Sequence, residues 1–191
     1  MANKRKSLSP IKGRILVASP LVTRDEYHQT VILITKIDQY RNVQGLILNR
    51  TTGNNVSEFS IELDNFRFPV RDGGVYEQDE LSVLHTKGNV IPDSRELFPG
   101  VCVDGDLDEL SYWLMLGQVD LSELLFVSGY CSWTADEFAT EMRRHEWYVT
   151  DATMDIVFTD RPHELWWEIV SSFGKYLHVV ADNAKALSIN N

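Results

Sequence analysis

Four side chains of this 191-residue chain stand out as candidates for nucleophilic or acid–base chemistry. Cys131 and Ser132 lie in the segment SGYCSW, which we predict to be a turn between a strand and a helix, and Ser19 lies in a second predicted turn. Thiolates are stabilised near helix N-termini, so Cys131 could be a nucleophile, and His85 could be a general base. The structural alternative is a small buried cysteine and a hydrogen-bonded core histidine.

A wider set of residues could bind a ligand rather than transform it. Asn49 and Arg50 end a predicted strand, Gly73-Gly74 form a predicted turn, and Tyr130 and Trp133 precede a helix. Arg50 supplies a forked cation and a helix start supplies backbone amides, and both suit an anion. In the alternative, Asn49 and the glycines only set turn geometry while Arg50 pairs with an acid. The candidate pocket, in which no residue is assigned a catalytic role, comprises Ser19, Asn49, Arg50, Gly73, Gly74, His85, Tyr130, Cys131, Ser132 and Trp133.

The distribution of charge disfavours direct binding of nucleic acid. The chain has 18 Lys and Arg against 28 Asp and Glu, a net charge of −10. Five of the basic residues lie in the first 14 positions with no acid, so the remaining body has 13 bases, 28 acids and a net charge of −15. Such a body repels phosphate, so only residues 1–12, which we predict to be a disordered basic arm, could contact nucleic acid. A basic protein partner fits the acidic surface better.

Several other classes of function lack support in the sequence. No stretch approaches 18 apolar residues and the N-terminus lacks the apolar centre of a secretory signal, so we predict neither a membrane span nor export. Two cysteines cannot make a disulfide framework, which favours the reducing cytoplasm. Without a Cys-x-x-Cys motif, clustered histidines or a phosphate loop, we expect no metal and no cofactor.

These residues must be positioned by a fold in which strands come first and helices later. That order, with β-α-β at the end, predicts one α+β domain over residues 13–191. A hairpin of the two apolar strands 30–36 and 44–50 is the clearest local pattern. The predicted strands are 13–18, 30–36, 44–50, 81–86, 98–103, 124–127, 147–150 and 156–159.

Three helices are predicted, over 106–116, 134–142 and 160–173. Thr134 and Glu137 have the spacing of a capping box, and Phe138, Ala139 and Met142 form the expected buried stripe of the second helix. In the third helix, the neighbours Trp166 and Trp167 differ by ~100° in direction, so one of them should be partly exposed. We take this pair as a candidate docking surface for a protein partner or a second copy of the chain.

Taken in order, several segments resemble the AlgH/YqgE family. The resemblance spans roughly residues 13–173, and it implies a complex α+β fold in which a bifurcated mixed sheet curls into a pseudo-barrel with about three main helices. The family carries the label of transcriptional regulator, from an association with control of alginate production, and it has no established biochemical activity. The matching motifs are Ala18-Ser19-Pro20, Thr30-Val31-Ile32-Leu33-Ile34, Gly45 to Arg50, Gly73-Gly74, Leu84-His85, Gly129-Tyr130-Cys131-Ser132-Trp133, Glu137 with Glu141, Trp147 and the helix starting at Pro162.

We therefore predict a non-catalytic binding or regulatory protein that acts through a protein partner or a small ligand. Any effect on transcription would be indirect, because the body of the protein is acidic. The alternative hypothesis is a small hydrolase or transferase with a Ser or Cys nucleophile carried on a loop. That alternative requires Ser19, Asn49, His85 and Cys131 to converge in one cleft.

Overall fold

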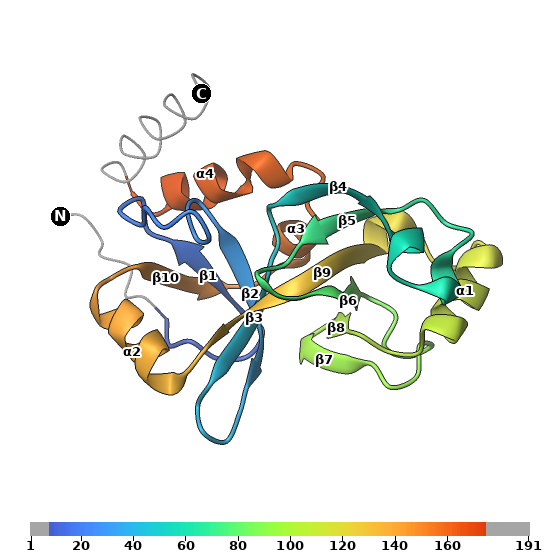
Figure 1. Cartoon of the computed structure of the whole chain (residues 1–191), viewed down its shortest axis with the longest axis horizontal. Helices are drawn as coiled ribbons and strands as arrows, with labels where there is room; N and C mark the ends of the chain where they lie inside the picture. The colour runs from blue at the N-terminus through green and yellow to red at the C-terminus, as the bar shows by residue number, and fades with distance from the viewer. Residues whose placement is uncertain (1–7, 175–191) are drawn as a thin grey trace.

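The computed structural model describes residues 8–174, and the ten strands among them form one curled mixed sheet (Figure 1). The strands are β1 Arg14–Ala18, β2 Val31–Ile37, β3 Val43–Ile47, β4 Thr51–Asn55, β5 Pro69–Asp72, β6 Tyr76–His85, β7 Arg95–Phe98, β8 Val101–Val103, β9 Leu124–Trp133 and β10 Trp147–Asp151. Their order is β10-β1-β2-β3-β9-β6-β8-β7, with β5 and β4 attached at β9. The predicted α+β class is confirmed.

The sheet forks at β9 because the two halves of this strand have different neighbours. Residues 126–128 pair in parallel with β5, whereas residues 131–133 pair antiparallel with β3. Gly73 lies at the fork, where its N–H donates to the Ser128 carbonyl (2.8 Å) and its own carbonyl accepts from Ile47 N–H (3.0 Å). A Cβ at position 73 would lie 2.5 Å from Val127 Cγ1 and collide with the Gly129 carbonyl. The lack of a side chain at Gly73 therefore permits this close backbone approach.

Within residues 8–174, three longer α-helices and one single-turn α-helix pack against the sheet. They are α1 Leu107–Met115, α2 Ala135–Arg143, α3 Met154–Val157 and α4 Pro162–Ser172. Figure 1 shows α1 and α2 at opposite ends of the molecule, with α4 along one side. Each of the three longer helices covers a buried apolar cluster. Leu110 belongs to the cluster under α1, Phe138 to the cluster under α2 and Val170 to the cluster under α4.

Two predicted strands are wrong in the structure. The segment 98–103 is not one strand, because Pro99 and Gly100 (φ +85°) turn the chain between β7 and β8. The segment 156–159 overlaps α3, whose N-cap Thr153 accepts a hydrogen bond from Ile156 N–H (3.3 Å). In both places a local turn or cap outweighs the strand preference of the neighbouring apolar residues.

The predicted turn at 128–133 is also wrong, and this correction matters most for function. The segment is the second half of β9, where Cys131 and Trp133 are buried while Tyr130 and Ser132 are half-buried. This alternation is the period of a strand. Gly129 instead allows a close crossing, because a Cβ there would lie 2.6 Å from the Gly74 carbonyl oxygen.

The described ends of the chain lie near the sheet. Within the predicted arm, Leu8 packs against the cluster under α2, and Lys12 Nζ donates to the Glu96 carbonyl (2.9 Å). Residues 1–7 of the arm and residues 175–191 of the predicted domain lie outside the described part of the chain. Over residues 8–174, every helix falls short of the length and apolar character that crossing a bilayer requires.

Candidate functional site

A cleft of about 620 Å³ lies between the loop that follows β1 and helix α2. Its walls are residues 21–24 of that loop, the outer side of α2 and the turn that leads into β10. The loop is held in place by two backbone bonds: Ser19 N–H donates to the Glu146 carbonyl (2.8 Å) and Val22 N–H donates to the Ser19 carbonyl (2.9 Å). The predicted Ser19 turn therefore positions a cleft wall.

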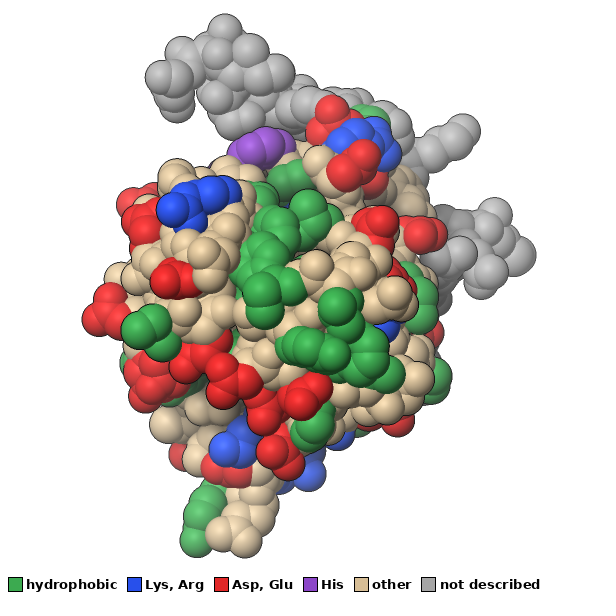
Figure 2. All heavy atoms as spheres, turned by 90° about the vertical axis from the view of Figure 1, so that its right-hand side faces the viewer, with side chains coloured by type: hydrophobic (Ala, Val, Ile, Leu, Met, Phe, Trp, Pro, Cys, Tyr) green, Lys and Arg blue, Asp and Glu red, His purple; other side chains and the backbone are tan. Residues whose placement is uncertain are grey.

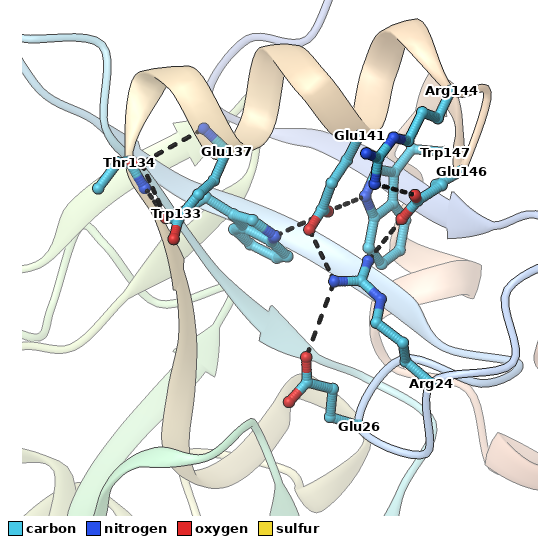
Figure 3. Close-up of polar contacts among 9 residues, drawn as sticks. All are labelled: Arg24, Glu26, Trp133, Thr134, Glu137, Glu141, Arg144, Glu146 and Trp147. Carbon is cyan, nitrogen blue, oxygen red and sulfur yellow. Dashed lines mark hydrogen bonds and ion pairs between the residues drawn. The ribbon is translucent and has the colours of Figure 1, made fainter.

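Glu141 of α2 is the most buried of the acids that line this cleft (Figure 3). The residue is only 8% exposed, and one of its carboxylate oxygens accepts hydrogen bonds from the indole N–H groups of Trp133 (3.0 Å) and Trp147 (2.7 Å). The other oxygen accepts from Arg24 Nη1 (2.9 Å). A buried carboxylate needs such donors, because without them the loss of hydration is uncompensated. Three donors thus hold the Glu141 carboxyl group in one orientation at the wall of the cleft.

Arg24 joins Glu141 to a second carboxylate. Its Nη2 donates to Glu146 Oε2 (2.6 Å), and its guanidinium carbon lies 5.0 Å from the centre of the Tyr27 ring. Partial burial lowers the pKa of Arg24, but the hydrogen bond and charge of Glu141 and the charges of Glu146 and Glu26 outweigh this and raise it above its ordinary value. The side chain remains 42% exposed, so a guanidinium reaches these two acids from solvent.

The local sequence explains why these groups meet. The predicted capping box of α2 is confirmed: Thr134 Oγ1 accepts from Glu137 N–H (3.3 Å), and Glu137 Oε2 accepts from Thr134 N–H (2.8 Å). The bonds that the Glu137 carboxylate accepts from the N–H and the hydroxyl of Thr134 lower the pKa of Glu137. Beneath the helix, the Trp133 and Trp147 rings meet edge to face with centroids 5.8 Å apart, and Tyr27 stacks on Trp133 at 5.3 Å. This packing of the three aromatic rings orients both indole N–H groups toward Glu141.

Sequence reasoning included Trp133 in the candidate pocket but missed Arg24, Glu141 and Glu146. A signal was present, since Glu141 lies three residues after Phe138 and therefore on the apolar face of α2. The predicted stripe placed Ala139 there instead, and the structure shows that Ala139 is exposed. An acid at a core position between two strand-borne tryptophans indicates a buried charge network.

Part of the predicted pocket does converge, but it is closed by its own hydrogen bonds. Asn49 Oδ1 accepts from Val31 N–H (2.8 Å) and its Nδ2 donates to the Gln29 carbonyl (2.8 Å). Arg50 donates to the Asp25 carbonyl (2.6 Å), and Gly74 N–H donates to Asp72 Oδ1 (3.0 Å). These residues tie loops to the fork in the sheet, as the structural alternative proposed for Asn49 and the glycines. Arg50 pairs with a backbone carbonyl there rather than with an acid.

Cys131 is placed in the core rather than on a loop. It is 1% exposed, and its Sγ lies 3.5 Å from the Gly73 carbonyl, to which it donates. Burial raises the pKa of the thiol, and the nearby charge of Arg50 opposes this only in part. A neutral, enclosed thiol is a poor nucleophile. Next to it, Ser132 is half-buried and pairs with Gln44 of β3.

His85 lies at the other end of β9 from Cys131. His85 pairs with Leu124, and Cys131 is seven residues further along the strand, which at about 3.3 Å per residue separates them by roughly 23 Å. The buried ring binds the Asp104 carbonyl through Nε2 (2.8 Å) and accepts from Lys87 N–H at Nδ1 (3.1 Å). Burial lowers the pKa of His85 despite the Asp104 contact. These contacts fit the structural interpretation, and the convergence required of an enzyme does not occur between these two residues.

The remaining predicted residues occupy separate places. Tyr130 is half-buried and stacks on Tyr76 with ring centroids 5.8 Å apart. Trp166 is 3% exposed and its indole N–H donates to the Ala18 carbonyl (2.8 Å), so it is unavailable to a partner. Trp167 is half-buried against the same core. The part of the chain described here contains no cluster of three His, Cys, Asp or Glu side chains suited to a metal ion.

Comparison with known proteins identifies the family of this chain. A family model described as AlgH-like matches residues 15–178. The chain belongs to the AlgH-like family. UPF0301 proteins of Chlorobaculum tepidum and Chlorobium limicola are 32% and 30% identical to it over 190 residues, covering 100% of each chain.

Solved structures show the same AlgH-like fold. The AlgH protein from Pseudomonas aeruginosa superposes with a TM-score of 0.67 at 23% identity, covering 87% of this chain and 91% of that one. A protein from Corynebacterium diphtheriae gives a TM-score of 0.74 at 16% identity, covering 94% and 96%. The resemblance to the AlgH family inferred from the motifs is confirmed, together with its curled α+β sheet. The names of the bacterial relatives state no activity.

Proposed function

We propose that this protein is a non-catalytic binding protein whose cleft between the 19–24 loop and α2 takes up a cationic group of a protein partner or small ligand. The observation that carries the proposal is Glu141, whose carboxyl group is oriented by two indole donors at the wall of an open cleft. A rigid, pre-oriented carboxylate binds a cation without the entropy cost of ordering the side chain.

The balance of charge in the cleft supports a cationic ligand. Four carboxylates contribute to its walls against two guanidinium groups; these are Asp136, Glu137, Glu141 and Glu146, with Arg24 and Arg144. Arg24 already occupies the position between Glu141 and Glu146, which demonstrates that a guanidinium fits there. An incoming arginine or lysine side chain would share or replace these contacts.

This proposal also gives the regulatory label a physical route. With a body of net charge −15, an effect on transcription through direct contact with DNA is disfavoured, whereas binding a basic segment of another protein is favoured. Catalysis is not needed for such a role.

The test uses the indole N–H signals of Trp133 and Trp147 in a ¹⁵N NMR spectrum of the full chain. The probe is an acetylated tri-arginine peptide, with a tri-glutamate peptide as its counterpart. We expect the arginine peptide to shift both signals in a saturable way and the glutamate peptide to leave them unchanged.

Two variants make the test specific. Glu146→Gln should weaken the response about tenfold, because one of the two carboxylates that bind a guanidinium becomes neutral. The matched control Asp79→Asn removes an exposed acid of β6 outside the cleft and should respond like the wild type. Unmoved indole signals at saturating peptide, or an unchanged response in Glu146→Gln, contradict the proposal.

A further inference from the structure

The end of the molecule around α1 exposes an unusual amount of apolar side chain. Five of the most exposed large hydrophobic residues lie on α1, on the residues that follow it, or on the adjacent one-turn 3₁₀ helix Ile61–Leu63: Ile61 (81%), Tyr112 (51%), Met115 (65%), Leu116 (51%) and Leu121 (51%). We call these five residues the α1 face. Figure 2 shows apolar side chains gathered over this end of the molecule.

The amphipathic pattern of α1 does not account for this exposure. Its buried side is supplied by Leu110, with Leu107 and Leu114 packed partly against the same cluster. The opposite side of a surface helix normally carries polar residues, yet here it presents Tyr112 and Met115 to solvent. Single exposed hydrophobic residues are common, whereas a group of them on one surface indicates a contact with another molecule.

The segments that carry the α1 face are acidic, and of their carboxylates Glu123 and Asp104 pair with bases from outside these segments, Lys87 (2.8 Å) and Arg95 (2.7 Å). The segments 56–64 and 104–123, which include all five residues of the face, contain nine acids and no lysine or arginine. Red acidic side chains border the green apolar ones in Figure 2. The nine acids are Glu58, Glu62, Asp64, Asp104, Asp106, Asp108, Glu109, Asp120 and Glu123.

We infer that the α1 face docks a partner-protein segment whose apolar side chains are flanked by lysine or arginine, such as a basic amphipathic helix. Apolar burial would supply the affinity, and the acidic border would select and orient the basic flanks. Two copies of this face brought together would set acid against acid, which disfavours self-association here. The face lies at the opposite end from the α2 cleft, so this inference stands independently of the proposed function.

The test titrates the full chain with an 18-residue helical peptide made only of leucine and lysine in an amphipathic pattern. Backbone NMR shifts should map to Tyr112, Met115 and Leu116, and raising the salt from 50 to 300 mM should weaken binding severalfold. A leucine–glutamate peptide of the same pattern should bind at least about tenfold more weakly.

Matched variants separate the apolar from the electrostatic part. Tyr112→Ser with Met115→Ser should weaken binding of the leucine–lysine peptide at least about tenfold, because these side chains are exposed and their loss removes contact area without disturbing the core. Glu62→Lys should weaken it while leaving the apolar residues in place. Tyr40→Ser, which changes a tyrosine 73% exposed on the β2–β3 turn, should have no effect.

Three results would overturn the inference. One is equal binding of the glutamate peptide, and a second is a shift map that avoids the α1 face. The third is a dimer in light scattering that Tyr112→Ser with Met115→Ser converts to a monomer, since the occupant would then be a second copy. Failure of the tri-arginine test at the cleft would leave each of these outcomes unaffected.

Discussion

At the scale of single residues, we expect Glu141 to contribute more to the free energy of unfolding than any exposed acid near it. Changing it to alanine would leave two indole N–H groups and one guanidinium without their acceptor. Trp133 and Trp147 are each 3% exposed, and a buried donor left without an acceptor costs about 1–3 kcal/mol of unfolding free energy. We therefore expect Glu141→Ala to lower the urea midpoint sharply.

The matched control for Glu141 is Glu26, which faces the same Arg24 at 3.9 Å with its side chain 45% exposed. Exposed pairs contribute about 0–1 kcal/mol, so Glu26→Ala should unfold close to the wild type. Equal effects of the two variants would show that burial of Glu141 is energetically unimportant. Urea unfolding followed by tryptophan fluorescence measures both.

The thiols provide a direct test of the discarded nucleophile. Cys102 and Cys131 are 8% and 1% exposed, and burial raises the pKa of both thiols. Because thiolate and access are both needed for reaction, we expect slow labelling by N-ethylmaleimide at pH 7 and rapid labelling of both in urea. Mass spectrometry of partly labelled protein assigns the site, and fast native labelling of Cys131 would revive the enzyme hypothesis.

His85 makes stability depend on pH. Burial lowers its pKa in the folded state, whereas the unfolded chain titrates near the ordinary value of about 6.5. The unfolded state therefore binds more protons below that pH, so the stabilisation from neutral His85 is complete above about 6.5 and is lost as the pH falls. We expect the difference in unfolding free energy between the wild type and His85→Gln to be smaller at pH 5 than at pH 7.5. A constant or widening gap in urea unfolding at the two pH values would contradict this sign.

At the scale of elements, the fork in β9 depends on Gly73. Alanine there would meet Val127 Cγ1 at 2.5 Å and the backbone carbonyl of Gly129, neither of which can move without disturbing the sheet. Overpacking of this kind costs about 1–3 kcal/mol or more. Gly53→Ala is the control, because a Cβ at Gly53 meets nothing within 4 Å, and it should change unfolding free energy by less than about 1 kcal/mol. Similar midpoints for both variants would mean that the crossing tolerates a side chain.

The elements also show where sequence patterns suffice. The β1, β2 and β3 strands and the capped helix α2 follow from local apolar period and capping residues, and they were predicted within a few residues. The second half of β9 was not, because Ser128-Gly129 resembles a turn although the pairing of Tyr130 with Tyr76 extends the strand. The cleft was missed because Arg24 and Glu141 are 117 residues apart in the sequence, and only the folded sheet brings them together.

At the scale of the whole molecule, the basic N-terminal residues and the acidic remainder of the chain suit different binding partners. The α2 cleft and the α1 face lie at opposite ends of the molecule, and we propose a cationic partner for each. A basic protein long enough to reach both would gain effective concentration from the second contact.

Nucleic acid should meet only the basic N-terminal residues. Lys12 and Arg14 are already engaged, with the Glu96 carbonyl and with Asp151. The other three basic residues of this end of the sequence, Lys4, Arg5 and Lys6, lie outside the described residues and are the ones to test. We expect weak binding of a fluorescent DNA duplex at 50 mM salt, lost by 200 mM, and none after Lys4, Arg5 and Lys6 are changed to serine. Removing three phosphate contacts would make the negative slope of log K against log salt shallower by up to about 3. Binding that survives the triple substitution with the same slope would show instead that the acidic body contacts DNA.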